Sequence, residues 1–98
     1  MKKLNEKYNS DFTIEIETNL TGMIVGNVNV QNPIIFVING TIIGDLTVEK
    51  NSRAILYGTI NGNIHSSGIC EVYGTVNGEL YDLNNNLFID KNAKINKL

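Results

Sequence analysis

The chain of 98 residues contains no tryptophan, one proline, one histidine and one cysteine, Cys70. A single cysteine excludes an internal disulfide framework. No apolar run approaches the roughly 20 residues of a membrane-spanning helix, and residues 1–11 lack the apolar core of a secretory signal. The net charge of −2 gives no electrostatic footprint for nucleic acid. We therefore expect no disulfide, no membrane span and no nucleic-acid partner.

Residues that bind metals or carry out catalysis are equally sparse. His65, the single histidine, follows Ile64 at an expected turn and has no second ligand beside it. A structural zinc site needs four ligands from the protein and a catalytic one needs three. The glycine segments also lack the Gly-Lys-Ser/Thr ending and following helix of a phosphate-binding loop. We therefore expect no catalytic residue, no metal site and no cofactor, and a protein that is not an enzyme.

Glycine, by contrast, recurs at regular intervals. Segment 58–64 reads Gly-Thr-Ile-Asn-Gly-Asn-Ile, similar segments begin at Gly40 and Gly74, and a weaker copy begins at Gly22. The first glycines of the four copies are therefore 18, 18 and 16 residues apart. A fixed period with glycine at constant places is typical of stacked rungs, one supersecondary unit per turn.

Each copy has two aliphatic residues four positions apart, with a glycine midway between them. Residues of one parity face the same side of a strand. We therefore expect two short strands that meet at the second glycine, where a side chain would collide with its neighbours. The predicted structural corners are Gly26, Gly44, Gly62 and Gly78.

The inward-facing positions are predicted to be even-numbered from residue 24 to residue 80. They are Ile24, Val28, Val30, Ile34, Phe36, Ile38, Ile42, Leu46, Val48, Ala54, Leu56, Ile60, Ile64, Cys70, Val72, Val76 and Leu80. Segments such as 54–57 and 69–73, between the glycine copies, supply a third side. The sequence therefore predicts an all-β fold, a short parallel β-solenoid with roughly three-sided rungs of 16–18 residues. We expect four to five rungs, and parity leaves the handedness of the coil open.

The two ends are expected to depart from the repeat. Residues 1–11 are polar and carry three lysines, which predicts a disordered N-terminal tail or, alternatively, a weak anchor for an anionic membrane. The solenoid domain is expected over residues 12–98. Alternation over 12–17 predicts a strand that starts or caps it, followed by a turn at Thr18 and Asn19. Residues 87–95 shift toward odd parity and predict a closing rung without a glycine corner.

Polar residues occupy equivalent places after the second glycines. Asn27, Asp45, Asn63 and Glu79 stand there, and we expect their stacked side chains to hydrogen-bond along the rod. Asp45 and Glu79 interrupt a pure asparagine ladder. We expect the apolar residues at odd positions to form an outer stripe of Ile35, Val37, Ile43, Ile55, Tyr57 and Tyr73, and Ile35, Val37, Tyr57 and Tyr73 would contact a protein partner.

The three clearest copies, 40–46, 58–64 and 74–80, and the closing segment 87–95 resemble the bactofilins, a family of bacterial polymer-forming cytoskeletal proteins. The resemblance covers about residues 20–96. It implies a compact right-handed β-helix that polymerises without nucleotide, lines the inner membrane and recruits cell-wall enzymes. We therefore expect a bactofilin-like cytoplasmic scaffold for cell shape whose partners are further copies of itself and cell-wall remodelling enzymes. A weak contact with the inner face of the cell membrane would accompany them.

The ends of a short solenoid are the expected polymer interface. Each end leaves unpaired strand edges and apolar interior in contact with water, and no segment is long enough to form a capping helix. We predict that Phe12 and Ile14 form the interface at one end and Phe88 and Ile89 at the other. Copies would then join end to end into filaments.

Two other functions fit the same repeat. The 18-residue period equals three hexapeptides, as in the left-handed hexapeptide-repeat acyltransferases, which act as trimers, although the glycines do not recur every six residues. A small β-solenoid can instead bind one protein partner, as an adaptor or immunity protein does, through the outer stripe. Electron microscopy would distinguish the three functions. Filaments would favour the bactofilin-like scaffold, trimers the acyltransferase, and monomers or dimers the single-partner protein.

Overall fold

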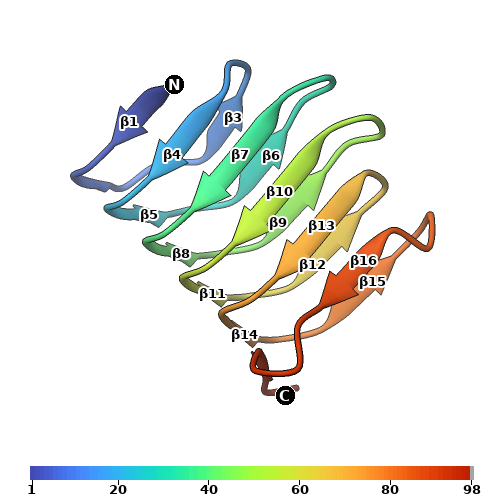
Figure 1. Cartoon of the computed structure of the whole chain (residues 1–98). Helices are drawn as coiled ribbons and strands as arrows, with labels where there is room; N and C mark the ends of the chain where they lie inside the picture. Colours follow the sequence, from blue (N-terminus) through green and yellow to red (C-terminus); the bar gives the residue numbers. More distant parts are fainter. Residues whose placement is uncertain (98) are drawn as a thin grey trace.

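The computed structural model describes residues 1–97, and these residues form 17 β-strands and no helix. The chain passes through three sides in turn, so that every third strand lies in the same sheet, as Figure 1 shows. Neighbouring strands in each sheet run parallel. The predicted all-β fold, a parallel three-sided β-solenoid of about five turns, is confirmed.

The strands are two to four residues long, and we name the three sheets A, B and C in the order in which the chain meets them. Sheet A contains β1 (Lys2–Leu4), β4 (Thr18–Leu20), β7 (Ile35–Ile38), β10 (Arg53–Leu56), β13 (Ile69–Val72) and β16 (Leu87–Ile89). Sheet B contains β2 (Lys7–Tyr8), β5 (Met23–Val25), β8 (Thr41–Ile43), β11 (Thr59–Asn61), β14 (Thr75–Asn77) and β17 (Lys94–Ile95). Sheet C contains β3 (Phe12–Ile14), β6 (Val28–Val30), β9 (Leu46–Val48), β12 (Ile64–Ser66) and β15 (Leu80–Asp82).

Inward residues of successive turns stack in register and form columns of mostly apolar side chains along the interior. All of the predicted inward residues are fully buried except Ile34 and Leu80, which are half-buried and pack against the core. Burying a large member of this set stabilises the fold by roughly 1.5–3 kcal/mol. The core also contains Leu4, Ile14 and Leu20, which lie in the first turn and at the start of the second. The interior therefore extends further toward the N-terminus than the glycine copies do.

The prediction of a disordered tail over residues 1–11 is wrong. Lys2–Leu4 pairs with Thr18–Leu20, and Lys7–Tyr8 pairs with Met23–Val25, so this segment forms most of the first turn. Leu4, Tyr8 and Phe12 are spaced four residues apart, as are Leu20, Ile24 and Val28 above them. This spacing is the signal in the sequence for the first turn, although no glycine marks it.

The next segment also differs from the prediction. Only Phe12–Ile14 of the predicted strand 12–17 is a strand, and it is the third side of the first turn. Thr18 and Asn19, expected in a turn, instead begin β4. The buried Thr18 hydroxyl donates a hydrogen bond to the carbonyl of Ile16 (2.8 Å), which satisfies it inside the rung.

The second glycine of each repeat lies between a strand of sheet B and a strand of sheet C. A Cβ on Gly62 would lie 2.1 Å from the carbonyl oxygen of Gly44, one turn earlier, and a Cβ on Gly78 would lie 2.1 Å from that of Gly62. The residue must be glycine because the backbones of successive turns stack directly on one another at this corner. The obstacle to a side chain is therefore a carbonyl group of the preceding turn.

A ladder of hydrogen bonds follows the same corner. The backbone N–H groups of Asn27, Asp45, Asn63 and Glu79 each donate to a side-chain oxygen one turn earlier, at 2.8–2.9 Å. The first acceptor is Asp11, which the sequence analysis did not include. Asp45 does not interrupt the ladder, because the ladder requires only an acceptor oxygen and a carboxylate supplies one.

Candidate functional site

The N-terminal end of the solenoid presents the free edges of β1, β2 and β3. Phe12 is half-buried there and packs edge-on against Tyr8, with ring centroids 5.4 Å apart. Ile14 is buried, whereas Ile16, just after β3, is 56% exposed. Lys2, Leu4 and the side chains around Phe12 line a hollow at this end. The predicted contact residues Phe12 and Ile14 therefore lie at the N-terminal end, but Phe12 is only partly accessible and Ile14 is buried.

The C-terminal end presents the free edges of β15, β16 and β17 in the part of the chain that the structure describes. Ile89 is in register with the buried Val72, and Leu87 is in register with the buried Cys70. Ile89 nevertheless remains 42% exposed, because no further turn covers it. The apolar interior of the solenoid is thus open at this end, and Ile89 lies there. Its role as an interface residue stays a prediction.

Phe88 lies elsewhere. It is in register with Glu71 on the outer face of sheet A, is 50% exposed, and its ring centroid lies 5.8 Å from that of Tyr73. The rung from Cys70 to Leu87 has 17 residues, an odd number, so the inward positions change from even to odd. The structure therefore brings Phe12, Ile14 and Ile89 to the ends and places Phe88 on the side of the rod.

Apolar and aromatic side chains cover part of the outer face of sheet A. Tyr57 and Tyr73 stack with their ring centroids 5.2 Å apart, and Phe88 continues this row. We call the group the sheet A patch; its members face outward from β7, β10, β13 and β16 or directly follow them, and they are Ile35, Val37, Ile55, Tyr57, Ile69, Tyr73 and Phe88. The residues of the predicted outer stripe lie on this face except Ile43, which is in β8 of sheet B. Ile69 and Phe88 enlarge the stripe.

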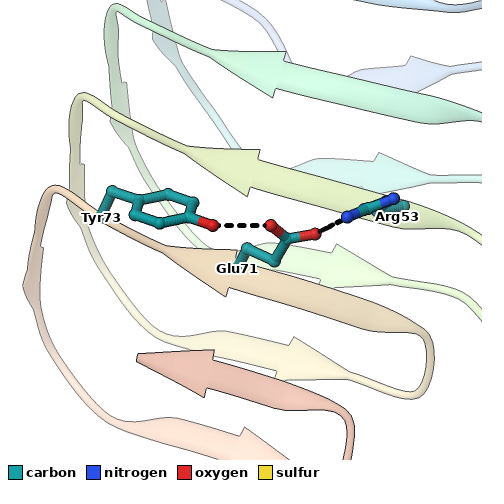
Figure 2. Close-up of polar contacts among 3 residues, drawn as sticks. All are labelled: Arg53, Glu71 and Tyr73. Atoms are coloured by element: carbon teal, nitrogen blue, oxygen red, sulfur yellow. Dashed lines mark hydrogen bonds and ion pairs between the residues drawn. The ribbon is translucent and has the colours of Figure 1, made fainter. Parts of the chain in front are cut away.

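A polar network on the outer face of sheet A joins Arg53, Glu71 and Tyr73, as Figure 2 shows. Arg53 donates two hydrogen bonds, from Nε and Nη2, to Oε2 of Glu71, and the Tyr73 hydroxyl donates to Oε1 of Glu71 at 2.8 Å. Partial burial acts to raise the pKa of Glu71, but the hydrogen bonds from Arg53 and Tyr73 and the charge of Arg53 outweigh it, so the pKa lies below its usual value. The hydrogen bond to Glu71 raises the pKa of Tyr73.

The groups considered for chemistry have structural neighbours. His65 stacks on Tyr81, with ring centroids 4.7 Å apart, on the outer face of sheet C. Burial, with the nearby charges of Glu71 and Asp82, raises the pKa of the Cys70 thiol to about 12. Within residues 1–97, no three His, Cys, Asp or Glu side chains gather as metal ligands would.

Residues 1–97 contain no helix able to cross a membrane. Comparison with family models, with curated protein sequences and with solved structures finds no match to this chain. Its function must therefore be argued from its own geometry, and the two ends and the sheet A patch are the candidate surfaces.

Proposed function

We propose that this chain is a structural protein that assembles end to end into filaments without nucleotide, as its resemblance to the bactofilins implies. The observation that supports this most is the construction of the two ends. Each end of the described chain presents three free strand edges, one from each sheet, around an apolar interior. A second copy offers the matching number of edges and a matching apolar surface.

Strand pairing and apolar contact are the forces that would hold the joint. Free edges carry unpaired N–H and C=O groups, which pair readily with another strand. Ile89 and Ile16, exposed at opposite ends, would lose contact with water in such a joint. Both contributions come from the protein itself, so assembly requires no bound nucleotide.

The cellular role follows from the resemblance. A filament of this kind would lie in the cytoplasm at the inner face of the cell membrane and scaffold cell-wall remodelling enzymes that determine cell shape. Lys3 and Lys7, which face outward from the first turn, would supply a weak contact with anionic lipid. The protein would act by positioning its partners and would not itself be an enzyme.

Electron microscopy and sedimentation of the purified protein over a range of concentrations test this proposal. The parent chain should form filaments, and Ile89→Arg should sediment as a small folded species, because the joint would bury an unpaired charge. Phe88→Arg is the matched control, one residue away but facing outward, and it should still assemble. A parent that stays monomeric at high concentration and physiological salt would rule out the filament.

The sheet A patch favours a second candidate function, the binding of one protein partner. Exposed aromatic residues are common at protein interfaces, and Tyr57 and Phe88 are each at least half exposed. The same pair of variants separates the two functions. Under the single-partner function, Phe88→Arg abolishes the biological effect while Ile89→Arg leaves it intact.

A further inference from the structure

The connections that lead from sheet C to sheet A differ in length from one turn to the next. Counted between inward residues, connection 48–54 spans six positions, connection 66–70 spans four, and connection 82–87 spans five. The shortest of the three therefore follows β12 and lies between the longer connections after β9 and β15 (Figure 1). It forms the floor of a recess, and its two longer neighbours form the walls.

The floor packs directly against the first wall. A Cβ on Gly68 would lie 2.4 Å from the carbonyl oxygens of both Glu49 and Ser52. These two residues form the base of a turn, in which the N–H of Ser52 donates to the carbonyl of Glu49 at 3.0 Å. Lys50 and Asn51 form the tip of this turn, and Asn51 has a left-handed φ of 68°. The first wall is therefore a closed turn that stands beside the floor.

The second wall is held by polar side chains. The N–H of Asn86 donates to Oδ1 of Asp82 at 3.1 Å, and Asn85 has a left-handed φ of 57°. The side-chain amide of Asn84 donates to the carbonyl of Ser67 in the floor. These contacts hold the wall in place without a ligand, which lowers the cost of ordering the site when a ligand binds.

The recess is a hollow with a volume of about 280 Å³, and we call it the C–A notch. It is lined by Lys50 and Asn51 from the first wall, by residues 67–69 from the floor, and by Asn84 and Asn86 from the second wall. The polar side chains of the lining are one ammonium group, three carboxamides and one hydroxyl. None of the lining residues carries a carboxylate, so the single charge in the notch is positive.

We propose that the C–A notch binds a uronic acid, a monosaccharide that carries one carboxylate and several hydroxyl groups. The ammonium group of Lys50 would pair with the carboxylate. A carboxamide both donates and accepts hydrogen bonds, as a sugar hydroxyl does, so Asn51, Asn84 and Asn86 suit the remainder of the ring. Ile69 is 43% exposed in the floor and offers an apolar surface to the C–H groups of the sugar.

Other small ligands match the lining less well. A neutral sugar would leave Lys50 without a counter-charge. Acetate or inorganic phosphate would pair with Lys50 but would leave most of the carboxamides without a ligand group. A divalent metal ion such as Ca²⁺ prefers carboxylate ligands, and the lining contains none. A ligand with one negative charge and many hydroxyl groups uses both kinds of side chain.

This inference goes beyond the proposed function and does not depend on assembly. The lining residues belong to the connections and to the start of β13, and β13 is paired on both sides, with β10 and β16. A filament joint formed through free strand edges would therefore leave these side chains in place. The notch should bind its ligand equally well in monomers and in filaments.

Saturation-transfer NMR of the full chain, with glucuronate and galacturonate as probes, tests the site, because it detects weak binding to small and large species alike. A ligand of this size should bind with a dissociation constant on the order of 1 mM. At least one of the two probes should bind about tenfold more tightly, or better, than glucose, acetate and inorganic phosphate do. Equal binding of glucose would overturn the role of charge, and equal binding of acetate or phosphate would overturn the role of the hydroxyl groups.

Variants locate the binding in the notch. Lys50→Gln should weaken binding of the uronate about tenfold or more, because it removes a hydrogen bond between charged groups. Lys91→Gln is the matched control, since it makes the same change of charge in the exposed turn between β16 and β17 and should bind as the parent does. Deleting Lys50 and Asn51 removes the tip of the first wall and should abolish binding, and circular dichroism establishes that each variant is folded.

Three results would overturn the proposal: neither uronate binds to the parent, Lys50→Gln and Lys91→Gln weaken binding equally, or the deletion variant folds and still binds. If the deletion variant does not fold, the comparison of Lys50→Gln with Lys91→Gln decides. Failure of this inference and failure of the proposed function remain distinguishable. Filaments without uronate binding would remove the notch alone, and uronate binding by a parent that never assembles would remove the filament alone.

Discussion

The corner between sheets B and C and the connection from sheet C to sheet A belong to the same turns but follow different rules. Inward residues on either side of the B–C corner are always four apart, from Tyr8 and Phe12 in the first turn to Val76 and Leu80 in the fifth. Across the C–A connection the separation varies: it is four from Ser66 to Cys70, five from Asp82 to Leu87 and six from Val48 to Ala54.

The difference follows from what is stacked at each place. At the B–C corner, a glycine lies against the carbonyl of the turn before it, and a side-chain oxygen accepts from the backbone of the turn after it. Both contacts require the same residue count in every turn. The C–A connection runs outside these contacts, so added residues such as Lys50 and Asn51 extend into solvent. Constant length therefore marks the places where consecutive turns are held together.

The largest expected effect is that of a side chain at the B–C corner. Gly62→Val should destabilise the fold by several kcal/mol, because its Cβ would lie 2.1 Å from the carbonyl oxygen of Gly44. Asn61→Val is the control, since Asn61 is exposed and in register with Ile43. Thermal unfolding should separate the two variants widely. A Gly62→Val melting temperature within a degree or two of the parent would contradict the stacked corner.

The hydrogen-bond ladder is the next strongest feature to test. Asn63→Ala leaves the N–H of Glu79 without its acceptor and should cost about 1–3 kcal/mol. Asn63→Asp keeps an acceptor oxygen and should cost less than about 0.5 kcal/mol. One turn earlier, the carboxylate of Asp45 already accepts the equivalent hydrogen bond from the N–H of Asn63. Urea unfolding measures both. Equal losses for the two substitutions would show that the acceptor oxygen is not what matters.

Deletions compare the two connections directly. Removing Lys50 and Asn51 shortens the separation from Val48 to Ala54 to that of the next turn, and the cost should stay within about 1 kcal/mol. The deletion also removes Asn51 from a left-handed conformation with φ of 68°. Removing Gly62 and Asn63 should instead prevent folding. Circular dichroism and thermal unfolding of the two deletion variants provide the measurement. Similar spectra and stabilities would show that the B–C corner tolerates a change of length as well as the C–A connection does.

The smallest effect is expected on the face of sheet A, where consecutive turns are joined by an exposed ion pair. Glu71→Gln should cost less than about 1 kcal/mol at pH 7, because solvent screens the pair with Arg53. The pKa of Glu71 is lowered in the fold, so its contribution is present above its ordinary value of 4.5 and is lost as pH falls through the lowered pKa. Melting temperatures of parent and variant should therefore converge in acid. A difference that persists at low pH would point to packing instead of charge.

Much of the fold could be predicted because its signals are local. Parity identified the inward residues from Ile24 to Val76 apart from the half-buried Ile34, and glycine spacing identified the corners. The first turn was missed because Leu4, Tyr8 and Phe12 carry the spacing without the glycines. Phe88 was placed at the end although the odd parity of its segment already indicated an outward side chain, since the 17-residue rung shifts the inward positions by one.

The sequence by itself determined the kind of coil, the number of sides and the composition of its interior. These depend on alternation within a strand and on glycine at a bend, which short segments specify on their own. Only the tertiary structure decided that the ladder includes Asp11 and that Glu71 joins Arg53 to Tyr73. These features arise from the register between turns, because stacking brings together residues 16 to 19 positions apart only once the whole coil has formed.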